Sequence, residues 1–452
     1  MTSFIAKPHE LFDRFDPKYV AFKRRAANFR YPAVKMGSLL SEPPEYGAGE
    51  AGIERVDEAT PRYIRITDID ENGELLPGLG MTAANVEPQY FLRDGDLLFA
   101  RSGNTVGKSY LHESEQVPYP CFYAGYMIRF RFGEKVLPKY VFAFAQTPYY
   151  HEWVSAIQRS AGQPNINAQE YRSLEIPLPP LSEQRKIVAE LDAAYVAKRA
   201  ADEKAAKLLA SIDDMVLNEL GIAKLPKPDT SLSSRIFTVS AREVANATLA
   251  PDHYFDSIDF SKAKYPCERF VERIDIDPPC GLEQITKLVP MESVSAEWCA
   301  IESIEDISPD ATQGYSTFRG GDVIWARITP CMENGKSAVV EAEPSECFCG
   351  STEFLVFRPK DDKVNPFYLQ SLLHLKRFRE VAAHHFTGTS GHQRVTADFF
   401  KAISIPIPPR PVQDRIASTA SSIRAEARKL KADATSALDA AKRKIENSLV
   451  NN

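Results

Sequence analysis

The sequence lacks the features of a secreted, membrane-spanning or uniformly basic protein. Residues 1–8 contain no apolar core of the kind found in a signal peptide. No uninterrupted apolar run approaches the roughly 18 residues that a transmembrane helix requires. A net charge of −6 excludes a histone-like protein but not a local basic face. Seven cysteines is an odd number for a disulfide framework, so we expect a cytoplasmic protein with reduced thiols.

Motifs for catalysis and for metal binding are also scarce. No glycine-rich phosphate or S-adenosylmethionine loop follows a predicted strand, and Gly320-Gly321 is interpreted as a turn. Residues 365–368 (NPFY) lack the second proline of the amino-methyltransferase motif and indicate a helix start. Cys347 and Cys349 have no partner pair at zinc spacing, so we interpret them as structural thiols. A hydrolase whose catalytic residues lie far apart in the sequence stays open as an alternative.

The most informative feature present is a long internal repeat. Short segments recur in the same order at a nearly constant offset: 95–101 (GDLLFAR) as 321–327 (GDVIWAR), 107–108 as 335–336, 176–180 (IPLPP) as 405–409 (IPIPP), 16–19 as 250–254, and 63–69 as 298–304. A period of about 226 to 235 residues is too long for a solenoid. The repeat therefore predicts a duplicated domain.

Each copy ends in a predicted long helix. Ser182 is a suitable N-cap, and neither proline nor glycine follows it before Gly221. Pro411 suits the first position of a second helix, which continues without proline or glycine. The 4-3 spacing of small and apolar residues in both helices is typical of a coiled-coil seam. The predicted seam comprises Ile187, Leu191, Ala194, Lys198, Ala201, Ala205, Leu208, Ile212 and Met215 in the first helix, and Ile416, Ala420, Ile423, Ala427, Leu430, Ala434, Ala437, Ala441 and Lys444 in the second.

We predict that these two helices pair with each other as an antiparallel coiled coil. The interface residues would be Ile187, Leu191, Leu208, Ile212, Ile416, Ile423 and Leu430. The alternative is two amphipathic helices that each pack on their own globular region. The small seam residues favour close contact between the helices.

The remaining sequence predicts an α/β fold of the mixed α+β kind in each copy. Strands are expected at 63–69, 124–132 and 354–357, and helices at 138–153 and 366–384. The predicted domains are a first globular domain at 1–180, a central helix at 181–221, a second globular domain at 222–409 with an N-terminal linker at 221–235, and a C-terminal helix at 410–452.

Local charge points to a DNA-facing side. Residues 374–401 carry five Lys or Arg, two acids and half of the histidines, whereas acids gather at 42–74 and 292–310. Arg129 and Arg131 add positive charge in the first copy. Phosphate binding requires only a local basic patch. The histidines at 374, 384, 385 and 392 could suggest a metal, but no carboxylates at ligand spacing support one, and we expect solvated or DNA-facing side chains.

The loops that correspond between the copies carry side chains suited to base edges and phosphates. Residues 101–104 correspond to 327–330, and 159–166 correspond to 387–395. The candidate DNA contacts are Arg101, Ser102, Asn104, Lys108, Arg159, Gln163, Asn165, Arg327, Thr329, Lys336, Thr389, His392, Gln393 and Arg394. The alternative is a structural role in which these loops brace the edge of a sheet.

Several of these motifs resemble one known family. Residues 176–188 (IPLPPLSEQRKIV) resemble the entry to the spacer helix in specificity subunits of Type I restriction–modification systems. Residues 95–98 with 101–103 and 107–108, and residues 162–166 (GQPNI), resemble the target-recognition domains of that family. The resemblance covers essentially the whole chain. The second copy departs from the family pattern at Thr329-Pro330 and at 411–415 (PVQDR).

The resemblance implies a non-catalytic subunit with two target-recognition domains that read a bipartite, asymmetric site in double-stranded DNA. The implied partners are two modification (adenine N6-methyltransferase) subunits and restriction translocase subunits. S-adenosylmethionine, ATP and magnesium are expected on those partners, with no cofactor or metal on this chain. A helix of about 39 residues would span roughly 58 Å, or on the order of 17 base pairs. The alternatives are a self-contained DNA-modifying or DNA-cleaving enzyme and a coiled-coil scaffold with no DNA role.

Overall fold

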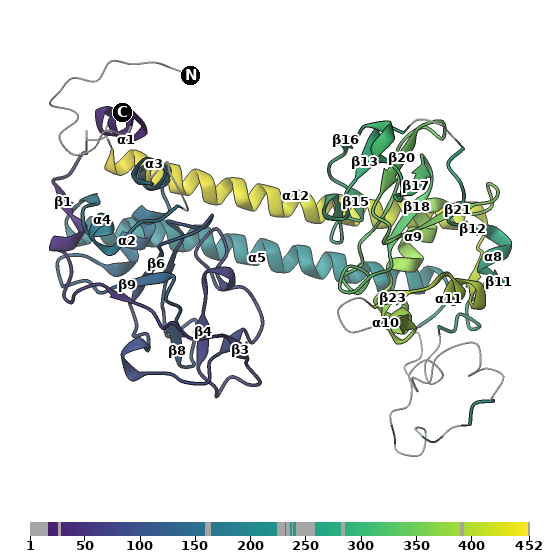
Figure 1. The fold of residues 1–452 in the computed structure, drawn as a ribbon, viewed down its shortest axis with the longest axis horizontal. Coiled ribbons are helices and arrows are strands. Elements are labelled where there is room, and N and C mark those ends of the chain that lie inside the picture. Colours follow the sequence, from purple (N-terminus) through teal and green to yellow (C-terminus); the bar gives the residue numbers. More distant parts are fainter. Residues whose placement is uncertain are drawn as a thin grey trace. The chain divides into compact units, whose positions relative to one another are not determined.

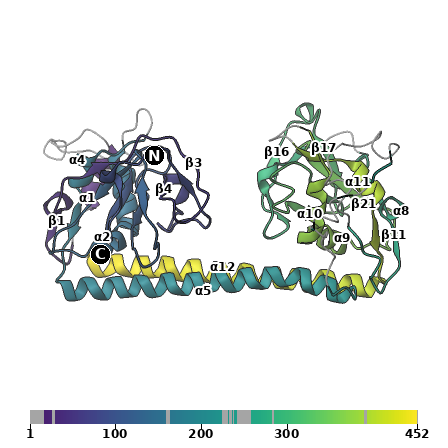
Figure 2. The same ribbon diagram turned by 90° about the horizontal axis from the view of Figure 1, so that it is seen from below.

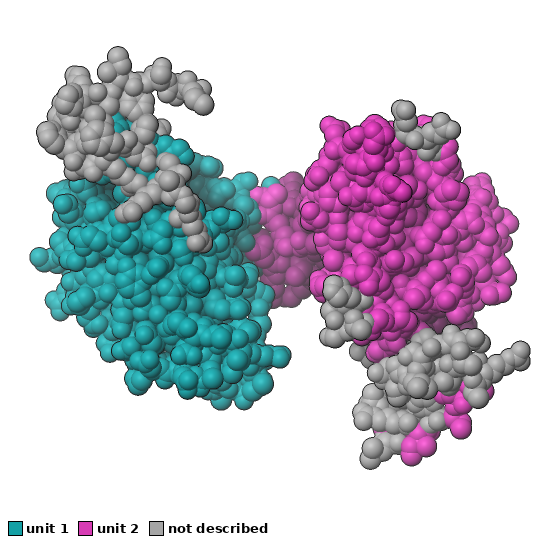
Figure 3. Space-filling view, viewed as in Figure 1, with its two compact units in different colours: residues 1–200, 433–452 teal, residues 201–432 magenta. Residues whose placement is uncertain are grey.

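The computed structural model describes residues 17–25, 29–158, 164–223, 231, 236, 238–240, 258–281, 285–388 and 393–450. The chain divides into two compact units, which are coloured separately in Figure 3. Unit 1 comprises residues 1–200 and 433–452, and unit 2 comprises residues 201–432. Four candidate DNA contacts, Arg159, Gln163, Thr389 and His392, lie outside the described residues. In the part of the chain that is described, no helix is long and apolar enough to cross a membrane.

Unit 1 is built around two four-stranded sheets (Figure 1). Their strand orders are β2-β9-β6-β7 and β3-β5-β4-β8, and β4 pairs with β8 in parallel. All four residues of β6 are buried, as expected for a central apolar strand. The strands of unit 1 are β1 (Ala33–Lys35), β2 (Glu45–Tyr46), β3 (Ile53–Glu54), β4 (Arg62–Ile64), β5 (Met81–Thr82), β6 (Leu97–Ala100), β7 (Ser109–Leu111), β8 (Cys121–Tyr123), β9 (Met127–Phe130) and β10 (Glu175–Pro177).

Helices of unit 1 pack against the β2-β9-β6-β7 sheet in one large apolar core, and the β3-β5-β4-β8 sheet contributes to a second, smaller core. The helices are α1 (Pro17–Arg25), α2 (Pro138–Ala145), α3 (Pro148–Ile157), α4 (Ala168–Arg172) and the first part of α5 (Leu181–Glu219). The predicted single helix at 138–153 is therefore two helices. Pro148 disfavours helical backbone in the preceding residue, and the side chain of Thr147 caps α3 by accepting a hydrogen bond from Tyr150 N.

Unit 2 repeats this architecture. Its sheets have the orders β12-β21-β18-β19 and β16-β13-β20-β17, and β13 pairs with β20 in parallel. The strands are β11 (Cys267–Arg269), β12 (Ile274–Ile276), β13 (Lys287–Val289), β14 (Val294–Ser295), β15 (Ala300–Ile301), β16 (Glu305–Asp306), β17 (Ser316–Arg319), β18 (Val323–Ala326), β19 (Ser337–Val339), β20 (Cys347–Gly350), β21 (Phe354–Pro359), β22 (Phe386–Thr387), β23 (Arg394–Val395) and β24 (Ser404–Pro406). The helices are α8 (Phe270–Arg273), α9 (Pro366–His374), α10 (Lys376–His384), α11 (Ala397–Ala402) and the first part of α12 (Arg410–Leu449).

The mixed α/β fold and the duplication are confirmed, but one predicted correspondence is wrong. Tyr63 lies in β4, which pairs in parallel with β8, and Leu288 lies in β13, which pairs in parallel with β20. Because β8 and β20 are matching strands of the two copies, Leu288 is the equivalent of Tyr63. Residues 298–304, which the sequence comparison aligned with 63–69, follow later in the chain. The predicted strand at 63–69 is also too long. It ends at Ile64, because the Asp68 carboxylate accepts the Arg65 backbone N–H and closes a 3₁₀ turn.

The two long helices form an antiparallel pair, as predicted (Figures 1 and 2). In unit 1 the beginning of α5 packs with the end of α12, and Glu190 bonds Lys444 at 2.6 Å. In unit 2 the end of α5 packs with the beginning of α12, and Glu219 bonds Arg415 at 2.7 Å. The apolar faces of both helices also contact the sheets and shorter helices of each unit. The two long helices therefore pair with each other and also pack on the globular regions, so both predicted alternatives are present.

The predicted seam fails near the end of α12. Ala437 is exposed, and Leu438, Ile445 and Leu449 are buried instead. The predicted seam residue Lys444 forms an exposed ion pair at the edge. A strict 3.5-residue period drifts around an α-helix of 3.6 residues per turn, and a four-residue step after position 434 restores the buried face.

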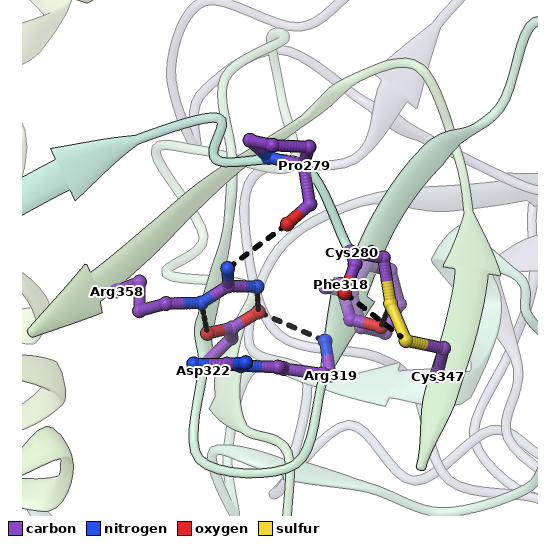
Figure 4. Close-up of a disulfide and its surroundings, with 7 residues drawn as sticks. All are labelled: Pro279, Cys280, Phe318, Arg319, Asp322, Cys347 and Arg358. Atoms are coloured by element: carbon purple, nitrogen blue, oxygen red, sulfur yellow. Dashed lines mark hydrogen bonds and ion pairs between the residues drawn. A yellow bond between two sulfur atoms is a disulfide. The ribbon is translucent and has the colours of Figure 1, made fainter. Parts of the chain in front are cut away.

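One further expectation is corrected in unit 2. Cys280 and Cys347 form a disulfide across 67 positions of sequence, with their Cα atoms 6.3 Å apart (Figure 4). The sequence analysis expected only reduced thiols because the cysteine count is odd. A count says nothing of which two side chains the folded strands bring together. Cys121, Cys267, Cys299, Cys331 and Cys349 are free.

Candidate nucleic-acid interface

In unit 1 the two loops that carry predicted DNA contacts lie side by side. Ile166 donates its backbone N–H to the Arg101 carbonyl at 2.8 Å, and Gly103 donates to Pro164 at 3.1 Å. Arg101 N in turn donates to the carbonyl of Tyr126 at 2.9 Å. We call residues 101–103, 126 and 164–166 junction 1. It brings together the predicted contacts Arg101, Ser102 and Asn165.

Unit 2 contains the equivalent junction. Val395 N donates to the Arg327 carbonyl at 2.9 Å, Thr329 N donates to Gln393 at 3.0 Å, and Arg327 N donates to Glu353 at 2.9 Å. We call residues 327–329, 353 and 393–395 junction 2. The predicted contacts Arg327, Thr329, Gln393 and Arg394 belong to it. Each junction thus joins three segments that are distant in the sequence.

The two predicted lysine contacts are engaged inside their own domains. Lys108 Nζ donates to the Ile69 carbonyl at 2.7 Å, and Lys336 Nζ donates to the Met291 carbonyl at 2.8 Å. Both side chains are half-buried. These bonds tie the start of the strand that follows each Gly-Lys pair to a 3₁₀ turn, at residues 66–69 in unit 1 and 291–293 in unit 2. Asn104 is exposed immediately after junction 1 and is not part of its hydrogen-bond network.

Junction 1 places its arginine against an aromatic ring. The Arg101 guanidinium lies 4.9 Å from the centroid of the Tyr46 ring, at a distance typical of a cation–π contact. Its Nε atom is buried without a hydrogen-bond partner. Tyr126 is 66% exposed, which is unusual for a large aromatic side chain next to a basic group. The pattern suits stacking and hydrogen bonding with a nucleic acid.

In junction 2, one carboxylate lies against both arginines. Glu353 accepts hydrogen bonds from Arg394 Nε at 2.8 and 3.0 Å and from Arg394 Nη2 at 2.6 Å. Its Oε2 atom lies 3.5 Å from Arg327 Nε. The hydrogen bonds from Arg394 lower the pKa of Glu353, so this carboxylate is ionised at neutral pH.

Sequence reasoning missed Tyr46, Tyr126 and Glu353. One signal was available for two of them. Tyr126 directly precedes β9, and Glu353 directly precedes β21, so the repeat places both at the same position. Tyr46 carried no such signal, because its contact with Arg101 depends on the pairing of β2 with β9.

The Gly-Asp pair that occurs in both copies has the same structural role in each. Asp96 is 1% exposed and binds the guanidinium of Arg131 through two hydrogen bonds of 2.6 and 3.0 Å. Asp322 is equally buried and binds Arg358 through two bonds of 2.7 Å (Figure 4). Gly95 precedes the first pair with φ of 82°, a left-handed conformation that favours glycine.

These pairs correct the predicted separation of charge in the first copy. Arg131 is neutralised by Asp96 and Glu42, and Arg129 is 5% exposed and bonded to Glu45. The acids at the start of region 42–74 therefore neutralise arginines that the sequence analysis placed on a DNA-facing side. Asp and Arg residues far apart in sequence meet because β2, β6 and β9 share one sheet.

The histidines of unit 2 do not form a metal site in the described part of the chain, where no group of three or more possible metal ligands occurs. His374 is half-buried, and its Nε2 atom lies 3.2 Å from the Ala296 carbonyl. Burial, with Arg379 and Arg424 nearby, lowers the pKa of His374 to about 3. The expectation of a solvated or DNA-facing side chain is therefore wrong for His374, whose ring faces the Ala296 carbonyl. His385 packs against Phe399.

The family model and the curated relatives that match this chain belong to the same family. The model of the Type I restriction modification DNA specificity domain matches residues 82–203 and 292–435, which together are more than half of the chain. The chain is 31% identical over 168 residues to the Type I restriction enzyme EcoAI specificity subunit of Escherichia coli, covering 37% of this chain and 28% of that protein. It is 25% identical over 219 residues to the EcoKI specificity subunit of Escherichia coli strain K12, covering 47% of this chain and 45% of that protein.

These matches span less than half of the length of either curated relative. Among solved structures, one chain from a study of the assembly of a type I R-M system is 18% identical, with a TM-score of 0.48. That match covers 92% of this chain and 97% of the other.

Proposed function

Because this chain belongs to the family of Type I restriction modification DNA specificity domains, we propose that it is the DNA-specificity subunit of a restriction–modification complex. Each globular domain would read one half of a bipartite, asymmetric target in double-stranded DNA. The main support for this proposal is that junctions 1 and 2 have the same backbone hydrogen bonds but different side chains. A shared scaffold provides the same approach to DNA, and different side chains select different bases.

The predicted DNA contacts divide between the two halves of the target. Arg101, Ser102, Asn104 and Asn165 would serve the first half-site, with Arg159 and Gln163 in the adjoining loop. The second half-site would be contacted by Arg327, Thr329, Gln393 and Arg394, with Thr389 and His392. Lys108 and Lys336, which bond to carbonyls of their own domains, would support the fold. Arginine at each junction suits a guanine edge or a phosphate.

The paired helices would set the distance between the half-sites. The helix α5 has 39 residues, or roughly 58 Å at 1.5 Å per residue, and contributes to both units. The helix α12 has 40 residues and also contributes to both. Two continuous helices in an antiparallel pair resist bending better than a single helix or a flexible linker.

Catalysis would belong to the partners. We propose that two methyltransferase subunits, with restriction translocase subunits in the full complex, dock along the helices and supply the S-adenosylmethionine, ATP and magnesium sites. This chain would bind none of these cofactors itself. The absence of methyltransferase and ATPase motifs from the sequence supports the proposal.

Methylation mapping tests the proposed function. The chain is co-expressed with its modification subunit in a host that lacks other adenine methylation, and the methylated sites are sequenced. The expected result is a single split motif with two different half-sites. Methyl transfer by the isolated chain supplied with S-adenosylmethionine, or a continuous motif, would overturn the proposal.

A further inference from the structure

Glu353 is an acid placed among the arginines of a proposed DNA-binding junction. It bonds Arg394 along the Nε–Nη2 edge and lies 3.5 Å from Arg327. Its side chain is 18% exposed, against 32% for Arg327 and 37% for Arg394. The carboxylate is thus the inner member of the cluster. Two guanidinium groups and one carboxylate leave junction 2 with one net positive charge.

Junction 1 differs at this position. Tyr126 takes the place of Glu353, and its carbonyl accepts the Arg101 N–H as the Glu353 carbonyl accepts that of Arg327. Among the described residues, no acid forms an ion pair with Arg101, whose guanidinium lies against Tyr46 instead. Two pairs of equivalent positions therefore differ in side-chain charge: Tyr126 against Glu353, and Asn165 against Arg394. Junction 2 has both an additional arginine and the carboxylate that binds it.

We propose that Glu353 is a positioning residue for DNA specificity, which orients Arg394 toward a guanine in the second half-site. The inference rests on the proposed function. A carboxylate bonded along one edge of a guanidinium fixes the plane of the whole group, because the group is rigid and flat. Guanine offers O6 and N7 in one plane, so a fixed plane favours guanine over other bases. Phosphate binding needs no such orientation.

Glu353 also reduces the attraction of junction 2 for any DNA sequence. Each cation that neutralises a phosphate steepens the salt dependence of binding by about 0.9 in logarithmic slope. A carboxylate that lies between two arginines cancels about one positive charge, and so removes about one contact between a cation and a phosphate. Specificity is the ratio of target to non-target affinity, so weaker non-target binding raises it. A purely structural role for Glu353 would instead affect stability and leave the salt slope unchanged.

The test uses the full complex with its modification subunits. Glu353→Gln is compared with the control variant Glu341→Gln, which removes the same charge. Glu341 follows β19 and lies beside the start of β18, whereas Arg327 follows the end of β18. Binding to the mapped target and to a scrambled duplex is measured at several salt concentrations. For Glu353→Gln we expect tighter binding to the scrambled duplex, a slope steeper by about 0.9, and a lower target preference. The control should match the wild type.

Modified bases examine the guanine contact directly. Replacing guanines of the second half-site by 7-deazaguanine removes the N7 acceptor, and should weaken wild-type binding by about tenfold at one position. The loss should be smaller in Glu353→Gln. The same replacement in the first half-site should affect both proteins equally. Tyr126→Glu, at an exposed position that does not endanger folding, should make the slope shallower by about 0.9 through pairing with Arg101.

The outcomes separate the two proposals. A wild-type complex that shows no preference for its target would overturn the proposed function and this inference together. A selective wild type with an unchanged slope and unchanged target preference in Glu353→Gln would overturn this inference alone. Equal sensitivity of the wild type and Glu353→Gln to 7-deazaguanine in the second half-site would also overturn it.

Discussion

The side-chain amide of Gln184 holds the backbone of Leu137, with Oε1 accepting the Leu137 N–H at 2.8 Å although 47 positions separate the two residues. The Gln184 Nε2 atom donates to the carbonyls of Lys135 and Pro179. Gln184 is fully buried at the start of α5. One side chain therefore joins the long helix to the turn that precedes α2.

The same connection occurs in unit 2. Gln413 Oε1 accepts the Asn365 N–H at 2.8 Å, and its Nε2 atom donates to the carbonyls of Lys363 and Pro408. The departure of residues 411–415 from the family pattern therefore leaves this glutamine in place. In each domain, a buried glutamine amide therefore joins the start of a long helix to the backbone that precedes a shorter helix.

Replacing this amide should destabilise the unit that contains it. In Gln184→Leu the volume is kept but the backbone N–H of Leu137 loses its acceptor, so we expect the free energy of unfolding to fall by about 1–3 kcal/mol. Urea denaturation measures the change. Arg185→Ala, at the exposed neighbouring position, should alter stability by less than about 0.5 kcal/mol. Equal stability of the two variants would show that the amide contacts contribute nothing.

Unit 2 should lose stability in mild acid because of His374. The pKa of this half-buried imidazole is lowered to about 3 by desolvation and by nearby arginines, whereas an unfolded histidine has a pKa near 6.5. Between these values the unfolded chain binds the additional proton. Stability should therefore fall as the pH decreases from about 6.5 toward 3, by up to about 1.4 kcal/mol per pH unit. His374→Gln should flatten this part of the profile in denaturation experiments, and an identical slope in wild type and variant would contradict the prediction.

Lengthening both long helices should lengthen the gap between half-sites. We insert seven helix-forming residues after Ala200 in α5 and seven after Ala432 in α12, at the boundaries of the two units. A heptad preserves the seam and adds about 10.5 Å, or about three base pairs. Methylation mapping should then find unchanged half-sites with a longer gap.

Insertion into α5 alone serves as the control. It shifts one helix against its antiparallel partner by seven residues, so methylation should be lost or strongly reduced. An unchanged gap with full activity in the double insertion would mean that the helices do not set the spacing.

Arg101 and Lys108 should behave differently when neutralised. Arg101→Gln should weaken DNA binding and make the salt slope shallower by about 0.9 if the guanidinium meets a phosphate. Lys108→Met removes the hydrogen bond to the Ile69 carbonyl, and should lower the stability of unit 1 by about 1.5–3 kcal/mol. Salt-dependent binding and thermal unfolding, measured on both variants, distinguish the two effects. A stability loss confined to Arg101→Gln would reverse the assignment.

The sequence alone determined the duplication, the two long helices and the pairing of the helices. These features depend on local signals: proline at the helix starts, uninterrupted helix formers, and apolar residues at 4-3 spacing. It also identified loops 101–104 and 327–330 as parts of the candidate interface, because both copies repeat the flanking strand. Family membership, supported by the same motifs, agrees with these predictions.

Only the tertiary structure decided which charged groups are available for the proposed contacts with DNA. Asp96 meets Arg131 across 35 positions, Glu353 meets Arg394 across 41, and Cys280 meets Cys347 across 67. Their pairing follows from which strands are neighbours in a sheet, and a strand's neighbour is chosen by the burial of whole sheets rather than by the residues beside the charge. Periodicity along the chain therefore predicts helices and strands, whereas the partners of an arginine, a carboxylate or a thiol are set by contacts between distant segments.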